Sequence, residues 1–205
     1  MSISLYDSFI VGSLPSQPHH GTFLFAEAVG EAGLRELILY IAAQCANDPK
    51  FGATKLNKIL WWADFLSYAE RGKPITGIEY QRLGNGPAPR RLVPVRNQMQ
   101  ADGDIVLVEV PGRGGYIQKK IIPRRAADLT LFSAADIAVV DDVIRALWNK
   151  TARGVSTLSH GKAWEVATDG ASIPYEAVFL SDDPINRYDV ARTKELARQF
   201  GWALA

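Results

Sequence analysis

The sequence predicts an α+β protein, a mainly α-helical single domain with a small antiparallel β-hairpin inserted after the second helix. Apolar residues recur at helical spacing in segments 34–48, 54–71 and 133–148. Two β-rich runs, 104–111 and 116–123, flank a glycine-rich turn. The 205 residues contain no repeat and no evident linker. We expect an N-terminal arm at 1–30, the domain at 31–180, and a C-terminal helix within 181–205 packed on the same domain.

The first helix follows the spacing i, i+3, i+4, i+7 and i+11 and ends before Asp48-Pro49. Its apolar positions are Leu34, Leu37, Ile38, Ile41 and Cys45. Because Cys45 lies on this stripe, we expect a buried thiol. Ahead of this helix, the arm contains Pro15 and Pro18 and shows no helical period.

The second helix is apolar on two sides. Thr54 suits its N-cap and Gly72 its end, and its regular stripe is Leu56, Ile59, Leu60, Ala63 and Leu66. At 100° per residue, Trp61, Phe65 and Tyr68 form a separate arc. Either both arcs are core, as in a central helix, or the aromatic arc binds a partner.

A strand over 77–83 should follow, stopped by the turn 84–87. A short helical segment then reaches Ala101, with Pro94 at a kink or at its true start. After the hairpin, Ser133 and Asp136 form a capping-box variant at the start of the third helix. A shorter helix is expected from Ser156 to Ala167, and a last one from Asp189.

Composition limits the class of protein. The N-terminus lacks a basic region before its apolar residues, and no apolar run approaches the ~18 residues of a membrane span. One cysteine allows neither an intrachain disulfide nor a thiolate metal cluster. We therefore expect a soluble cytoplasmic protein without membrane contact, and no metal or other cofactor.

Charge is unevenly distributed along the chain. The window 50–125 holds 14 basic and 6 acidic residues, net +8, whereas the flanks hold 9 basic and 16 acidic residues, net −7. Either the window binds an acidic partner or nucleic acid, or the acidic flanks fold back and neutralise it. The candidate partner-binding residues are Arg90, Arg91, Arg113, Lys119 and Lys120, together with the aromatic arc.

No catalytic motif is present. The sequence lacks a nucleophile elbow, a phosphate loop and an HExxH motif. The histidines are His19, His20 and His160, and adjacent Ser159 and His160 do not by themselves make a nucleophile and base. We expect no enzyme, and a hydrolase using Ser159 or His160 remains only an alternative to be checked.

Nucleic-acid binding has more support than catalysis. A helix followed by a basic hairpin is the order found in winged-helix proteins, where a helix enters a groove and the wing contacts phosphate. Arg90, Arg91 and Arg96 would lie on or near that helix. A winged-helix-like DNA-binding regulator is therefore the alternative function.

The second helix also carries a family resemblance. The run KLNKILWWAD, from Lys55 to Asp64, resembles the KLxKLLYxAD-type signature of the Panacea domain of SocA-like antitoxins. The turn Gly86-Pro87 resembles the family's Gly-Pro turn, and Ser159-His160 with Trp164 resembles its Ser-His and Trp element. The motif residues are Lys55, Leu56, Lys58, Leu60, Trp61, Ala63, Asp64, Gly86, Pro87, Ser159, His160 and Trp164. The resemblance covers roughly residues 33–180.

This resemblance implies an antitoxin of a bacterial, phage or prophage toxin-antitoxin system. Such a protein neutralises a cognate toxin by direct binding, and SocA-type members can instead deliver the toxin to a protease. An antitoxin can also regulate its own promoter, so the two proposed functions are compatible. The sequence does not name the toxin.

Overall fold

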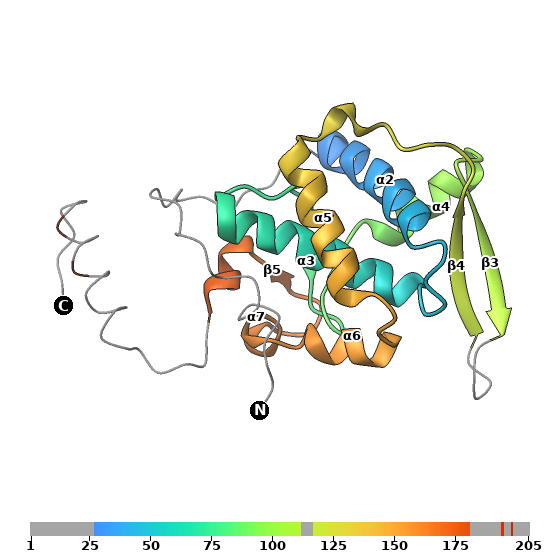
Figure 1. The fold of residues 1–205 in the computed structure, drawn as a ribbon. Coiled ribbons are helices and arrows are strands. Elements are labelled where there is room, and N and C mark those ends of the chain that lie inside the picture. Colours follow the sequence, from blue (N-terminus) through green and yellow to red (C-terminus); the bar gives the residue numbers. More distant parts are fainter. Residues whose placement is uncertain (1–26, 112–116, 181–193, 195–197, 199–205) are drawn as a thin grey trace.

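The computed structural model describes residues 27–111 and 117–180, together with 194 and 198. The elements are drawn in Figure 1. The α-helices are α2 (Glu27–Gln44), α3 (Ala53–Arg71), α4 (Leu92–Ala101), α5 (Ala134–Leu147), α6 (Ala152–Leu158) and α7 (Lys162–Val166). The strands are β1 (Tyr80–Gln81), β2 (Ala88–Pro89), β3 (Ile105–Pro111), β4 (Ile117–Pro123) and β5 (Ser172–Ile173), and the 3-10 helices are η2 (Leu129–Leu131) and η3 (Tyr175–Phe179). The mainly helical α+β class is thus confirmed.

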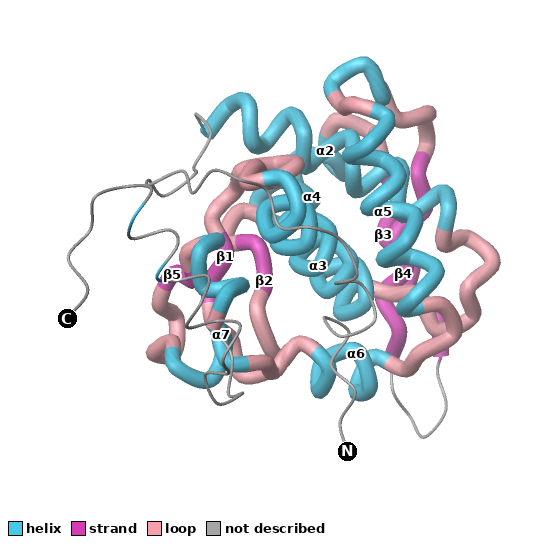
Figure 2. Tube along the Cα trace, turned by 60° about the vertical axis from the view of Figure 1, so that its left-hand side comes forward, coloured by secondary structure: helices cyan, strands magenta, loops and turns pink. Residues whose placement is uncertain are grey.

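Helix α3 is the centre of the fold. It packs against α2, α5 and α6 and also contacts β2, β4 and η3. In Figure 2 it runs between the helices α2 and α5 and the small sheet of β1, β2 and β5. Every residue from Ile59 to Ala69 is buried. A helix that is apolar on two sides is stable in this position because neighbours cover both sides.

This burial decides between the two explanations of the aromatic arc. Trp61, Phe65 and Tyr68 are 2%, 0% and 4% exposed. They pack with Tyr80 and Tyr175 in one aromatic cluster, in which the Phe65 and Tyr175 ring centroids are 4.9 Å apart. The arc is core, so its assignment as a partner-binding face is corrected: no partner can reach these rings in this fold.

Two of three predicted helix ends agree with the structure. Gly72 ends α3 with a left-handed φ of 68°, and its N–H donates to the Tyr68 carbonyl. Ser133 and Asp136 form the predicted capping box of α5. However, α3 starts at Ala53 after Gly52, so Thr54 is not its N-cap.

The small sheet joins segments far apart in the sequence. Its order is β2-β1-β5, all antiparallel, with Tyr80 opposite both Pro89 and Ile173. The strand expected over 77–83 is therefore reduced to two residues. On either side of the strand, the Ile78 carbonyl accepts from the Tyr175 hydroxyl, the Glu79 carbonyl accepts from the Arg90 N–H, and Arg82 bonds to the backbone of Gly170 and Ala171.

The hairpin forms as predicted. Strands β3 and β4 pair over seven residues each, from Ile105 opposite Pro123 to Pro111 opposite Ile117. Ile105 and Ile121 are buried against the body of the domain. Strand β4 lies next to the helices, and β3 forms the outer edge (Figure 1).

The segment expected to be one helix over 156–167 is two short helices. Thr151 caps α6 by accepting from the Gly154 N–H, and α6 ends at Leu158. Helix α7 starts only at Lys162, after Gly161. Ser159 and His160 therefore lie at a bend, not in the middle of a helix, and this bend turns both side chains toward the 84–87 turn.

The acidic flanks neutralise part of the basic window. In the described part of the chain, five ion pairs join a basic residue of the window to an acidic residue of a flank: Lys55–Asp48, Arg71–Asp136, Arg82–Asp169, Arg91–Glu31 and Arg125–Glu36. Folding thus pairs part of the basic window with the acidic flanks, which supports the second of the two explanations given for the charge segregation.

Several expectations fall outside the described residues. These are residues 1–26 of the arm with His19 and His20, Arg113 in the hairpin turn, and the helix expected from Asp189. Residues 27–30, assigned to the arm, instead open α2. Among the described residues, no helix is both long enough and apolar enough to cross a membrane.

Candidate functional site

The acidic end of the motif in α3 anchors the chain that follows the helix. The Asp64 carboxylate accepts hydrogen bonds from the Ile75 and Thr76 N–H groups at 2.8 and 2.7 Å. The Thr76 and Tyr80 hydroxyls also donate to it. Burial raises the pKa of Asp64, and the hydrogen bonds oppose that rise. Four donors on one buried carboxylate fix the path from α3 to β1.

The basic side of the motif has a different arrangement. Lys58 is 1% exposed, and its Nζ donates to the Pro87 carbonyl at 2.8 Å. Burial lowers the pKa of Lys58 to about 7. The Lys58 amine therefore holds the Gly-Pro turn against α3.

The Ser-His and Trp elements contact the same turn from the other side. The Trp164 Nε1 donates to the Leu83 carbonyl at 2.8 Å. The His160 ring stacks on Trp164, with centroids 3.9 Å apart and planes 9° apart. Ser156, in α6, donates to the Asn85 carbonyl. The bend between α6 and α7 thus clasps the turn 83–87.

Gly86 is the point where these elements converge. Its φ is +93°, and a Cβ at this position would lie 2.4 Å from Ser159 Oγ and 2.6 Å from Lys58 Nζ. The same Cβ would be 3.2 Å from His160 Cδ2. Only glycine fits both the backbone conformation and the space. We call this cluster the Gly-Pro clamp; its members are Lys58, Gly86, Pro87, Ser159, His160 and Trp164.

Lys55, the first residue of the motif, makes a separate buried ion pair. Its Nζ lies 2.6 Å from Asp48 Oδ2, and the two side chains are 1% and 0% exposed. Asp48 also accepts from the backbone N–H groups of Lys50 and Asn149. The pair ties the loop before α3 to the loop after α5.

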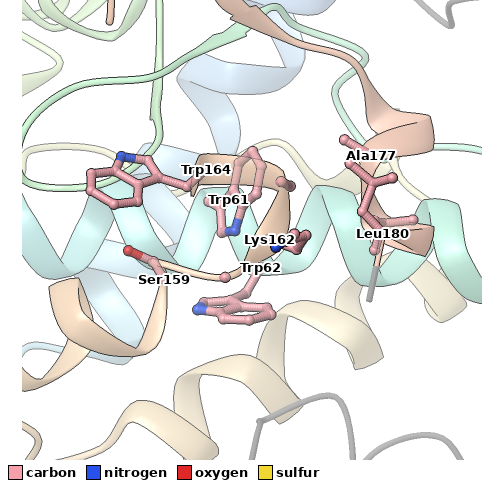
Figure 3. Close-up of a pocket in the computed structure, with 10 residues that line it drawn as sticks. Trp61, Trp62, Ser159, Lys162, Trp164, Ala177 and Leu180 are labelled. Carbon is pink, nitrogen blue, oxygen red and sulfur yellow. The ribbon is translucent and has the colours of Figure 1, made fainter. Parts of the chain in front are cut away.

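A small pocket adjoins the clamp. It is lined by Trp61, Trp62, Ser159, Gly161, Lys162, Ala163, Trp164, Ala177, Val178 and Leu180. Figure 3 shows Trp164 at one end of this pocket, Leu180 at the other, and Trp61 and Trp62 between them. Its cavity volume is about 20 Å³, the room of roughly one water molecule. A pocket of this size does not hold a substrate.

The side chains of the clamp do not form a nucleophile and base in this conformation. The Ser159 Oγ donates to the Ser156 carbonyl at 2.7 Å, and Ser159 is 2% exposed. His160 turns its ring face to Trp164, and burial lowers its pKa, as does the nearby Lys58 charge. The geometry fits a structural clamp better than hydrolysis.

The basic candidates for partner binding lie apart from the clamp. Arg90 pairs with Glu79 and donates to the Gly170 carbonyl. Arg91 pairs with Glu31. On the hairpin, Lys119 is exposed and lies 3.5 Å from Glu109, while Lys120 is half-buried. Lys119 is thus the most accessible of these four lysines and arginines.

One comparison decides the family. The model of the family described as "Antitoxin SocA-like, Panacea domain" matches residues 56–165, more than half of the chain. The chain belongs to this family. The match contains the whole Gly-Pro clamp and Asp64. No curated protein and no solved structure gives a significant match.

Within this Panacea domain, the sequence motif identified residues that the fold brings together, but not their partners. Asp48, Thr76 and Tyr80 complete the buried polar contacts of Lys55 and Asp64 and were not singled out from the sequence. Arg82 was missed as well; its guanidinium lies 4.3 Å from the Trp164 ring. In the sequence, the only signal for these four residues was that they lie near the motif along the chain, because their contacts form only in the tertiary structure.

Proposed function

We propose that this Panacea protein is an antitoxin that neutralises a cognate toxin by binding it directly in the cytoplasm, without catalysing a reaction. The observation that carries the proposal is the family match across the Gly-Pro clamp. The clamp, with a pocket of only about 20 Å³ beside it, suits a binding scaffold rather than a catalyst. Delivery of the bound toxin to a protease is a second route by which the same complex would act.

The toxin-binding surface that we propose lies over the clamp, within the domain assigned to 31–180. Four large apolar side chains are exposed there: Leu83, Val166, Phe179 and Leu180, at 39%, 59%, 58% and 48%. Trp164 donates to the Leu83 carbonyl, Val166 ends the same helix as Trp164, and Leu180 lines the adjoining pocket. Exposed apolar side chains on a rigid support are typical anchors of protein interfaces.

Two basic residues lie near this surface, but each is paired with a carboxylate. Arg82 lies over Trp164 and pairs with Asp169, and Arg90 donates to the Gly170 carbonyl and pairs with Glu79. We therefore expect apolar contacts, rather than charge, to dominate toxin binding at this surface.

Co-expression tests the proposal. The product of the neighbouring reading frame should stop growth when expressed alone and should be harmless, and co-purify, when this protein is present. Val166→Glu should weaken rescue, since it places a charge among the four apolar side chains. Val93→Glu, at a 53% exposed residue of α4, is the matched control and should rescue fully. A neighbour that is harmless alone and never co-purifies would refute the proposal.

Promoter DNA binding is the second candidate function. The helix-hairpin order of α4, β3 and β4 supports it, as does exposed Lys119. The ion pairs of Arg90 and Arg91 with Glu79 and Glu31 weaken it, because these arginines are already neutralised. Fluorescence anisotropy with the protein's own promoter should show affinity that falls steeply with salt. Absence of binding at low salt would remove this candidate.

A further inference from the structure

Strand β3 is an open sheet edge. In the described part of the chain, its sheet contains β3 and β4 alone. The far side of β4 is covered, because the Lys119 carbonyl lies against Gly52, where an added Cβ would be 3.2 Å from that oxygen. The far side of β3 has no such cover in the described residues: Figure 1 shows β3 as the outermost element of this end.

The ladder shows which backbone groups β3 leaves free. The Arg124 N–H donates to the Asp104 carbonyl, and these two residues continue the β3–β4 register. In an antiparallel pair such hydrogen-bonded positions alternate. Val106, Val108 and Val110 therefore bond to β4, and the N–H and C=O groups of Leu107 and Glu109 point away from β4, into the open side.

The side chains of β3 do not protect this edge. Natural edge strands carry charges, prolines or bulges that prevent pairing with another chain. Strand β3 reads IVLVEVP: Glu109 is its one charged residue, and Pro111 lies only at its end. Val106 and Val108 are each 39% exposed on the outer face, beside Ile122 at 42%. This is an unguarded aliphatic edge seven residues long.

We propose that the β3 edge pairs with the β3 edge of a second copy of this chain, giving a symmetric dimer with a continuous four-stranded sheet. The two-fold axis passes beside Val108. Leu107 then faces Glu109 of the second copy, so that the free N–H and C=O groups of both residues exchange hydrogen bonds on each side of the axis. Only these two residues of each β3 need to contribute.

The second copy fits this edge because β3 is complementary to itself in this register. Glu109 faces an aliphatic residue and not Glu109 of the other copy, so no like charges meet. Val106 faces Val110 of the second copy, and Val108 faces Val108. The basic residues of β4 lie one strand further away, ~10 Å from the second copy's β3, where their mutual repulsion is screened.

The axis makes a sharp geometrical prediction. The two Val108 Cα atoms would form a pair without hydrogen bonds, about 4.5 Å apart, which is within the range that a disulfide spans. The two Val106 Cα atoms would be separated by four residues along the strand, ~13 Å, which no disulfide can span. The chain's own thiol does not interfere, since Cys45 is 1% exposed and burial raises its pKa to about 12.

Val108→Cys and Val106→Cys are therefore a matched pair, equal in exposure and on the same face. Under mild oxidation at micromolar concentration, Val108→Cys should form a disulfide-linked dimer at least ~10-fold faster than Val106→Cys, because a paired thiol has a millimolar effective concentration. Non-reducing gels measure both rates. Equal rates for the two variants would overturn the proposed register and axis.

A second pair of variants tests the edge without cysteine. Glu109→Pro removes an N–H that points to the open side, so the β3–β4 ladder keeps all its bonds. Sedimentation equilibrium should show that this variant is monomeric, whereas Glu109→Gln, which keeps the N–H, should dimerise like the wild type. Circular dichroism checks that Glu109→Pro is folded. Wild-type protein that stays monomeric at hundreds of micromolar overturns the proposal. The proposal is also overturned if the protein is a monomer in which bound toxin protects the β3 amides from hydrogen exchange.

Discussion

The buried amine of Lys58 should make the stability of this protein rise with pH. Its folded pKa is about 7, against an ordinary 10.5. Between these values the unfolded chain binds a proton at Lys58 that the native state does not. The free energy of unfolding therefore increases as pH rises through this window. Below pH 7 the destabilisation caused by the charged Lys58 in the core is fully present.

The magnitude follows from the shift. Moving the pKa from 10.5 to about 7 corresponds to at most ~5 kcal/mol over the full range. Between pH 7 and pH 9, the wild type should gain about 2 kcal/mol from Lys58 alone. Above pH 9, Cys45 acts in the opposite direction, because its raised pKa makes the native thiol harder to ionise than the unfolded one.

Lys58→Met isolates this contribution. The variant keeps a straight side chain and removes the titrating group, at the cost of the hydrogen bond to the Pro87 carbonyl. Urea unfolding at half-unit steps from pH 7 to pH 9 should give a wild-type minus variant difference that grows by about 2 kcal/mol. The window starts at pH 7 because burial lowers the pKa of His160, whose effect on stability lies below pH 6.5.

Lys119→Met serves as the control for loss of one lysine charge, because the Lys119 side chain is 58% exposed and stays hydrated in the folded protein. Its unfolding free energy should follow the wild type across the window. Parallel pH profiles for the wild type and Lys58→Met would refute the reasoning, and would mean that water or a rearranged carboxylate reaches the Lys58 amine in solution.

Three further changes test the core and the clamp by urea unfolding. Gly86→Ala should destabilise by more than 3 kcal/mol, whereas Gly103→Ala, also at positive φ but with nothing within 4 Å, should cost only about 1 kcal/mol; similar losses would contradict the clamp. Asp64→Ala should cost more than Thr76→Val, because it leaves four donors unpaired rather than removing one. Phe65→Ala should lower the free energy of unfolding by about 3 to 5 kcal/mol. A near-neutral effect would contradict the assignment of the aromatic arc to the core.

Local signals accounted for the elements with strong periodicity. The spacing of Leu34 to Cys45, the stop at Gly72 and the capping box at Ser133 each act within a few residues, so the sequence predicted α2, α3 and α5. The hairpin was equally local, because its two strands adjoin in sequence. These predictions did not need the tertiary structure.

The candidate site was only half predictable. Family resemblance marked Lys58, Gly86 and Ser159, but nothing local indicated that Gly86 lies against the other two. Strand β5 was missed because two residues pairing with a segment about 90 positions away leave no periodic pattern. The bend at Ser159 was missed for a similar reason, since contacts with the turn at Asn85 override the helical spacing around it.

The sequence by itself determined the three long helices α2, α3 and α5, the hairpin and the family motif, since these depend on residues close along the chain. Only the tertiary structure decided which apolar faces are covered, and it placed Trp61, Phe65 and Tyr68 in the core. It also cancelled part of the basic window, because charge separated along the chain is brought together by ion pairs such as Arg125–Glu36. Burial and charge pairing depend on neighbours distant in sequence, so no local pattern could reveal them.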